Sequence, residues 1–177
     1  MSGGSMRKER PASFRGLEFL PVHLYVLVHL RKAGVDYAKM MAKMSELPPP
    51  LIEDAVRELM EAGLVQRDSG SAIKRSRARF KKAFEVHKHH TYYRLSREGE
   101  LFVRSIDENW LRNYFNSLFQ DGWKVVRALA GVKSFNELPK DFRGDKIREE
   151  LLLHRFITPA GRKTAFFKLL VEFLGGG

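Results

Sequence analysis

The 177-residue sequence contains no cysteine. This absence excludes a disulfide framework, a zinc site built on thiolates and a thiol nucleophile, and it suits a reducing cytoplasm, where we expect the protein to reside. Long apolar runs are also missing. The most apolar stretch, residues 17–30, is shorter than the roughly 20 residues that span a bilayer, and it contains Glu18, His23 and His29. We therefore expect no membrane partner.

Common enzyme motifs are absent as well. The sequence has no Gly-x-x-x-x-Gly-Lys-Ser/Thr phosphate loop, no Gly-x-Gly-x-x-Gly turn, no Gly-x-Ser-x-Gly nucleophile motif and no His-Glu-x-x-His zinc motif. His87 and His89 would share one face of a strand, but a zinc site needs three or four converging ligands. We expect a protein that is not an enzyme and that has no catalytic residues, cofactor or metal.

Acidic residues are the minority among the charged ones. Lys and Arg number 32 against 21 Asp and Glu, a formal net charge of +11, while 44% hydrophobic residues supply a packed core. A positive excess of this size favours a polyanionic partner such as DNA or RNA.

The positive charge is concentrated between residues 67 and 97. This stretch holds ten Lys or Arg against Asp68 and Glu85, a net charge of +8. Arg forms paired hydrogen bonds with phosphate and Lys adds a mobile charge, while each neutralised phosphate releases counterions and makes binding sensitive to salt. The plainer interpretation is a solvated loop. However, charge of one sign at this density repels itself when no acidic neighbours relieve it.

Three short helices are predicted before this stretch. Pro21 suits the first turn of a helix that ends at Gly34. Asp36 is expected to cap a second helix, on which Lys39 and Lys43 share a face exposed to solvent. Three consecutive prolines then start a third helix, whose core-facing stripe comprises Ile52, Ala55, Val56 and Leu59.

A helix-ending motif and a β-hairpin follow the third helix. Gly63 favours the left-handed conformation that ends helices, with Leu64 folding back on Leu59. Residues 65–68 predict one strand, and residues 90–95, which are rich in strand-forming side chains, predict the returning strand of a hairpin. Three helices followed by a hairpin wing predict a winged helix-turn-helix, a mainly α fold with a small β-hairpin wing (α+β).

The third helix is acidic on its predicted solvent face. It offers one cation, Arg57, against the carboxylates Glu53, Asp54, Glu58 and Glu61. Four carboxylates repel phosphate, so insertion of this helix into the major groove is disfavoured, and we expect the wing and the second helix to make the contacts. The predicted nucleic-acid-binding residues are Lys39, Lys43, Arg57, Arg67, Lys74, Arg75, Arg77, Arg79, Lys81, Lys82, Lys88, His89, His90, Arg94 and Arg97.

The sequence predicts two domains and two flexible ends. We expect a flexible arm at 1–16, the winged-helix domain at 17–106, a C-terminal domain at 107–174 and a flexible tail at 175–177. Near the domain boundary, the helix that follows Ser96 either continues to Phe119 or restarts at a capping box that begins at Ser105.

The C-terminal domain resembles a reduced copy of the first. Residues 95–99 and 157–161 lie 62 residues apart, and each segment has a hydroxyl residue followed by a glycine. We interpret both as the same strand-to-helix junction. The second domain is then either a winged helix without its wing or a plain helical domain for docking or dimerisation.

An aromatic stripe at helical spacing lies in this second domain. It comprises Trp110, Leu111, Tyr114, Phe115, Leu118 and Phe119. Such a stripe must be buried, either inside the chain or against a second copy. We favour a homodimer, because many winged-helix proteins dimerise through terminal helices.

Five segments between residues 20 and 105 carry a resemblance to known proteins: Asp36-Tyr37-Ala38-Lys39, the helix end from Leu59 to Leu64, Ile73-Lys74-Arg75-Ser76, Phe80-Lys81-Lys82 and the stretch from Lys88 to Gly99. In these segments the chain resembles an uncharacterised archaeal family of winged-helix domains. The resemblance implies a winged-helix fold and an archaeal, thermophilic source, but no activity. The helix end and the Leu-Ser-x-x-Gly junction also look like the broader MarR/ArsR-like regulators, from which the acidic third helix departs.

Three functions remain open from the sequence. The favoured one is a DNA-binding transcriptional regulator or chromatin-associated protein that contacts the backbone through its wing. The second is an RNA- or ribosome-binding factor that uses the same wing. The third is a protein-interaction module whose acidic helix binds a basic partner.

Overall fold

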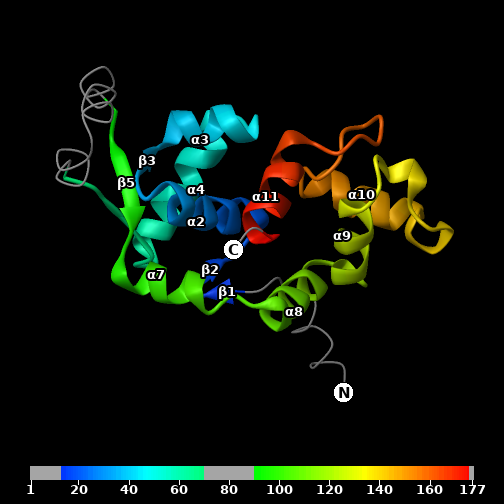
Figure 1. Ribbon diagram of the computed structural model, residues 1–177, viewed down its shortest axis with the longest axis horizontal. Helices are drawn as coiled ribbons and strands as arrows, with labels where there is room; N and C mark the ends of the chain where they lie inside the picture. The colour runs from blue at the N-terminus through cyan, green and yellow to red at the C-terminus, as the bar shows by residue number, and fades with distance from the viewer. Residues whose placement is uncertain (1–12, 70–89, 176–177) are drawn as a thin grey trace. The chain divides into compact units, whose positions relative to one another are not determined.

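The computed structural model of the protein describes residues 13–69 and 90–175. The chain divides into two compact units (Figure 1). The described part of Val22–Arg104 forms the N-terminal unit, and residues 13–21 and 105–175 form the C-terminal unit. Among the described residues, no helix combines the length and the apolar character needed to cross a membrane.

The N-terminal unit has the element order of a winged helix. Its elements are α2 (Pro21–Ala33), β3 (Asp36–Tyr37), α3 (Ala38–Ser45), α4 (Pro49–Glu61), β4 (Val65–Arg67), β5 (Tyr92–Leu95) and α7 (Arg97–Arg104). The strands form one antiparallel sheet in the order β3-β5-β4. The predicted fold class, mainly helical with a small β-sheet, is confirmed.

Helix α4 begins and ends where the sequence indicates. Prolines occupy its first turn, and Ile52, Ala55, Val56 and Leu59 form its buried stripe. Gly63 adopts a φ of 82°, and the amide of Leu64 donates to the carbonyl of Leu59 at 3.0 Å. The predicted left-handed helix end is therefore confirmed.

Helix α2 is the centre of the N-terminal unit. All ten residues from Pro21 to Leu30 are buried, including His23 and His29, which are each 2% exposed. Buried imidazoles need hydrogen-bond partners. The Nε2 atom of His23 lies 2.7 Å from the carboxylate of Glu58 on α4, so this contact ties α4 to the core.

A hydroxyl group joins the end of α4 to the start of α7. The Oγ atom of Ser96 donates to the carbonyl of Gly63 at 2.6 Å and accepts from the amide of Gly99 at 3.0 Å. The backbone there is so tightly packed that a Cβ on Gly99 would lie 2.0 Å from the carbonyl oxygen of Leu64. Only glycine fits at position 99 without a backbone shift.

The C-terminal unit is mostly helical. A small hairpin of β1 (Ser13–Phe14) and β2 (Leu17–Glu18) precedes α8 (Glu108–Leu118), α9 (Gly122–Ala130), the 3-10 turns η1 (Phe135–Glu137) and η2 (Lys140–Phe142), α10 (Asp145–Leu153) and α11 (Ala165–Gly175). The hairpin occupies the end of the segment expected to be a flexible arm; residues 1–12 and 176–177 lie outside the described residues.

The helix that follows Ser96 restarts before Phe119. Helix α7 ends at Arg104, and the Asp107 carboxylate caps α8 by accepting from the amide of Trp110 at 2.8 Å. Of the two alternatives, the restart is therefore the correct one, although the cap is Asp107 rather than Ser105.

The C-terminal unit repeats the winged-helix order in reduced form. Helix α9, a strand position at Ser134, the two 3-10 turns and α10 follow one another, and two further strand positions follow α10. The bridges Ile157↔Lys163 and Ser134↔Arg162 are antiparallel. The returning strand position thus lies between the other two, as β5 lies between β3 and β4.

Matching hydrogen bonds show that the repeat extends to atomic detail. The Oγ1 atom of Thr164 donates to the carbonyl of Arg155 at 2.7 Å and accepts from the amide of Phe167 at 3.0 Å, as Ser96 does with its own partners. The amide of Phe156 donates to the carbonyl of Leu151, as that of Leu64 does to Leu59. The hydroxyl and its carbonyl partner are 33 residues apart in the first unit and nine in the second.

The junction predicted at residues 157–161 is wrong. No helix begins there, because α11 starts at Ala165 and Thr164 caps it. The hydroxyl of Thr158 instead accepts from the amide of Arg162 at 3.2 Å, and Gly161 turns the chain with a φ of 90°. Residues 157–161 resemble residues 95–99 only in their amino acids. The residue of this unit that makes the hydrogen bonds of Ser96 is Thr164.

The close packing at Gly99 gives a direct test of the junction. Gly99→Ala should lower the free energy of unfolding by about 3 kcal/mol, since an overpacked site without room must move its backbone. Gly131→Ala is the control, because a Cβ there would meet its nearest neighbour at 3.7 Å. Denaturant titration of both variants measures the difference, and equal stabilities would contradict this account.

Candidate nucleic-acid interface

The base of the wing presents three arginines on its surface. Strands β4 and β5 pair in a register that places Gln66 opposite Arg94 and Arg67 opposite Tyr93. Arg67, Arg94 and Arg97 are exposed. The Nε atom of Arg94 lies 3.5 Å from the carboxylate of Asp68, whereas Arg67 and Arg97 form no ion pair within the described residues.

Helix α3 adds two exposed cations next to β3. Lys39 and Lys43 are exposed, as predicted, and neither is paired with a carboxylate in the part of the chain that the structure describes. The opposite face of α3 is buried through Met41, Ala42 and Ser45. The two ammonium groups are therefore available to a partner.

The remaining predicted wing residues fall in two groups. Outside the described residues lie Lys74, Arg75, Arg77, Arg79, Lys81, Lys82, Lys88 and His89. His90 is described, and its ring stacks on Tyr37 with centroids 4.1 Å apart, while Tyr92 packs edge-on against the same tyrosine at 5.2 Å. His90 is thus part of the packing at the base of the wing.

Helix α4 is acidic, as predicted, but its charges are partly engaged. Arg57 pairs with Asp54 at 2.8 Å, and this hydrogen bond, followed by nearby carboxylates, raises the pKa of Arg57. Glu58 contacts the buried His23. Arg57 is therefore an exposed cation whose charge is largely balanced by its own helix, unlike Lys39 and Lys43.

A groove runs between α4 and the wing strands. It has a volume of about 310 Å³ and is lined by Glu53, Val56, Arg57, Met60, Glu61, Arg67 and Tyr93. Two carboxylates and two guanidinium groups share its walls, so the groove has no strong charge of either sign. Net positive charge at this surface must come from the strands and the wing.

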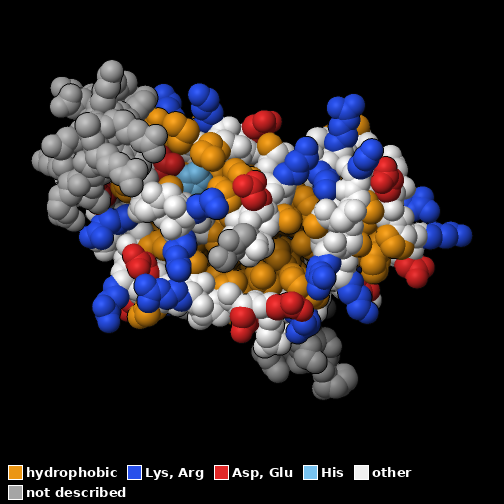
Figure 2. Space-filling view, in the orientation of Figure 1, with side chains coloured by type: hydrophobic (Ala, Val, Ile, Leu, Met, Phe, Trp, Pro, Cys, Tyr) orange, Lys and Arg blue, Asp and Glu red, His pale blue; other side chains and the backbone are white. Residues whose placement is uncertain are grey.

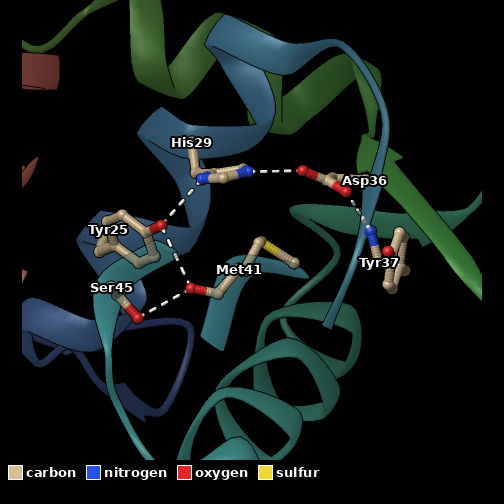
Figure 3. Close-up of polar contacts among 6 residues, drawn as sticks. All are labelled: Tyr25, His29, Asp36, Tyr37, Met41 and Ser45. Atoms are coloured by element: carbon tan, nitrogen blue, oxygen red, sulfur yellow. Dashed lines mark hydrogen bonds and ion pairs between the residues drawn. The ribbon is translucent and has the colours of Figure 1, made fainter. Parts of the chain in front are cut away.

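A buried polar network holds the neighbouring β3 in place (Figure 3). The Nε2 atom of His29 on α2 lies 2.8 Å from the Asp36 carboxylate, and its Nδ1 atom lies 2.9 Å from the hydroxyl of Tyr25. That hydroxyl donates to the carbonyl of Met41 at 3.4 Å. The other Asp36 oxygen accepts from the amide of Tyr37 at 2.9 Å. Burial, followed by the charge of Asp36, raises the pKa of Tyr25, which keeps its hydroxyl protonated as a donor.

Asp36 does not cap the second helix, contrary to the prediction from the sequence. Tyr37 occupies the cap position and makes no side-chain cap bond. The carboxylate of Asp36 reaches back to His29 instead, and a buried imidazole holds it more firmly than a solvated helix end would. Through Tyr37 and its stack with His90, the network supports the base of the wing.

The aromatic stripe of the C-terminal unit packs within the chain. Tyr114, Phe115 and Phe119 are buried. The hydroxyl of Tyr114 donates to the carbonyl of Phe19 at 2.9 Å, and Phe19 also packs edge-on against Trp110.

The rest of the stripe borders an apolar groove. Leu111 and Phe115 line a hollow of about 590 Å³, together with Trp123, Phe167 and Leu170, while Leu118 is half-buried. The contacts of the stripe are thus made inside this unit, and the homodimer stays a prediction.

The His29–Asp36 contact yields a prediction about stability. Asp36→Ala should cost about 3 kcal/mol of unfolding free energy, because it removes the carboxylate that contacts the buried His29 and accepts from the amide of Tyr37. Asp54→Ala removes an exposed pair and should cost less than about 0.5 kcal/mol. If denaturant titrations give both variants the same stability, the network does not support the unit.

Comparison with known proteins identifies a family to which the N-terminal unit is similar. The search of curated proteins gave no match. The family described as uncharacterised protein conserved in archaea, DUF2250, matches residues 14–106, which include the whole sheet and helices α2, α3, α4 and α7. That match spans more than half of the chain, so the protein belongs to this family conserved in archaea.

Proposed function

We propose that the protein binds nucleic acid through the backbone, most favourably duplex DNA, as a transcriptional regulator or chromatin-associated protein. The observation that carries the proposal is the basic segment 67–97, with a net charge of +8, which joins the adjacent strands β4 and β5 of a winged-helix-like unit. Phosphate is the counter-charge that such a segment attracts.

The contacts are made by the wing and α3 rather than by α4. Arg67, Lys39 and Lys43 are exposed and unpaired within the described residues, whereas the exposed face of α4 balances Arg57 with carboxylates. Phosphate contacts position a protein on a duplex but carry little sequence information. We therefore expect binding that tolerates many sequences.

Structured RNA is the second candidate ligand. The groove of A-form RNA that carries base edges is wide and shallow, and proteins recognise it by shape and backbone without inserting a helix. The acidic α4 is compatible with this mode, as it is with wing-led binding to DNA. A ribosome-bound factor would use the same cations.

The test is a salt titration of binding. Fluorescence anisotropy of labelled duplex DNA and of structured RNA should show affinity that falls steeply with salt. Replacing Lys74, Arg75 and Arg77 with glutamine should flatten the slope of log K against log salt by up to about 3, since each phosphate contact contributes about 0.9. The nucleic acid that binds more tightly identifies the ligand class.

The control variant removes three positive charges outside the wing. Arg104, Arg112 and Arg127 are exposed and lie within 4 Å of Glu100 or Glu108. Their glutamine variant should keep the slope of the unmodified protein, because neighbouring carboxylates already balance these cations. Salt-independent binding, or an equal loss in both variants, would overturn the proposal.

A further inference from the structure

We propose that the C-terminal unit has a phosphate-binding surface of its own, centred on Arg155 and Arg162 at its contracted wing. The contracted wing is the turn of residues 158–161, which joins the strand positions Ile157 and Arg162. This inference rests on the proposed function, since it assigns a second contact surface for the same polyanion.

Arg162 takes the place that Arg94 has in the N-terminal unit. Val65 pairs with Leu95 there, and Ile157 pairs with Lys163 here, so Arg94 and Arg162 each precede the paired residue of the returning strand. Alternation along a strand directs both side chains away from the buried face. Both are exposed, but Arg162 has no carboxylate partner among the described residues, whereas Arg94 has Asp68.

Arg155 takes the place of Gly63 at the end of the third helix. Its φ is 62°, in the left-handed region that Gly63 enters freely at 82°. A side chain in this conformation is strained, so glycine would be the stable choice. An exposed arginine without a carboxylate partner in the described chain occupies the position instead. Backbone strain of this kind occurs at binding sites, but Arg15, Glu46 and Asp121 share the positive φ, so the exposed charge of Arg155 carries the argument.

The contracted wing is held rigidly. The amide of Thr158 donates to the carbonyl of Arg162 at 2.8 Å, and the amide of Phe135 donates to that of Gly161 at 2.8 Å. From α10, the guanidinium of Arg148 donates to the carbonyl of Pro159 and lies over the ring of Phe135. A fixed backbone presents Arg162 to a phosphate with little loss of conformational freedom on binding.

The charge around this turn has one sign. Residues 151–171 contain Arg155, Arg162, Lys163 and Lys168 and no Asp or Glu. Figure 2 shows Lys and Arg side chains projecting from the face of the C-terminal unit that is drawn there. The preceding helix α10 carries Asp145, Glu149 and Glu150 together with Lys146 and Arg148, so it is close to neutral. The cations that follow α10 therefore give this end of the unit its positive charge.

The experiment compares two double variants of the full chain. Arg155→Gln with Arg162→Gln should weaken binding of labelled duplex DNA or RNA at every salt concentration and flatten the salt slope by about 2. Arg112→Gln with Lys124→Gln, on α8 and α9, removes the same charge and should leave the slope unchanged.

The outcomes separate this inference from the proposed function. In one outcome, the unmodified protein binds, the glutamine variant of Lys74, Arg75 and Arg77 binds more weakly, and the Arg155/Arg162 variant binds as the unmodified protein does. The second surface then does not exist, while the proposed function stands. If the unmodified protein shows no salt-dependent binding, both fail. Preference for an acidic peptide over nucleic acid at this surface would also overturn the inference.

Arg155→Gly separates binding from stability. Because glycine adopts a positive φ without strain, this variant should keep or raise the thermal midpoint while it loses affinity and about 1 unit of salt slope. Arg155→Lys keeps the charge and should retain the slope. A fall in midpoint with unchanged affinity in the glycine variant would show that Arg155 is structural.

Discussion

In each unit of this protein, one hydroxyl group links the end of the third helix to the start of the next helix. Ser96 in the first unit and Thr164 in the second donate to the carbonyl that follows the third helix and accept from the first turn of the next helix. A hydroxyl can do both because it carries a donor and acceptor lone pairs on one atom. The contact fixes where the returning strand ends, and so it also fixes which side chains of that strand face outward. Arg94 and Arg162 face outward as a consequence of this contact.

Features set by a few consecutive residues could be predicted from the sequence. The proline start of α4, its buried stripe and its end at Gly63 are local, and so is the exposure of Lys39 and Lys43. Features that depend on distant partners could not. An aspartate before a helix satisfies the rule for a cap. Nothing in the sequence reveals that the carboxylate of Asp36 contacts His29 on the neighbouring helix instead. The counterpart of Ser96 was likewise misplaced, because a wing shortened by 24 residues changes the offset between the two copies.

The acidic face of α4 has a structural explanation that does not depend on a partner. Glu58 satisfies His23, a buried imidazole on the central helix, and Asp54 pairs with Arg57. Removing such carboxylates to favour DNA would remove the contact between Glu58 and the buried His23, which stabilises the unit. A helix under this constraint contributes little attraction for phosphate. Attraction must then arise from other segments, and the segment between β4 and β5 has the excess of Lys and Arg that this requires.

Under the proposed function, the two wings would contact a polyanion in different ways. The long connection accumulates charge, and its attraction for a polyanion acts at a distance and depends strongly on salt. The short connection has few cations, but its hydrogen bonds to α10 and to Phe135 fix the backbone that carries Arg162. Placing a guanidinium in advance reduces the entropy lost when phosphate binds, so one arginine there can replace several in a longer segment. Under the proposed function, the first wing would provide most of the attraction and the second would provide register. An arginine at position 155 would then serve that role, although glycine would adopt its φ of 62° more easily.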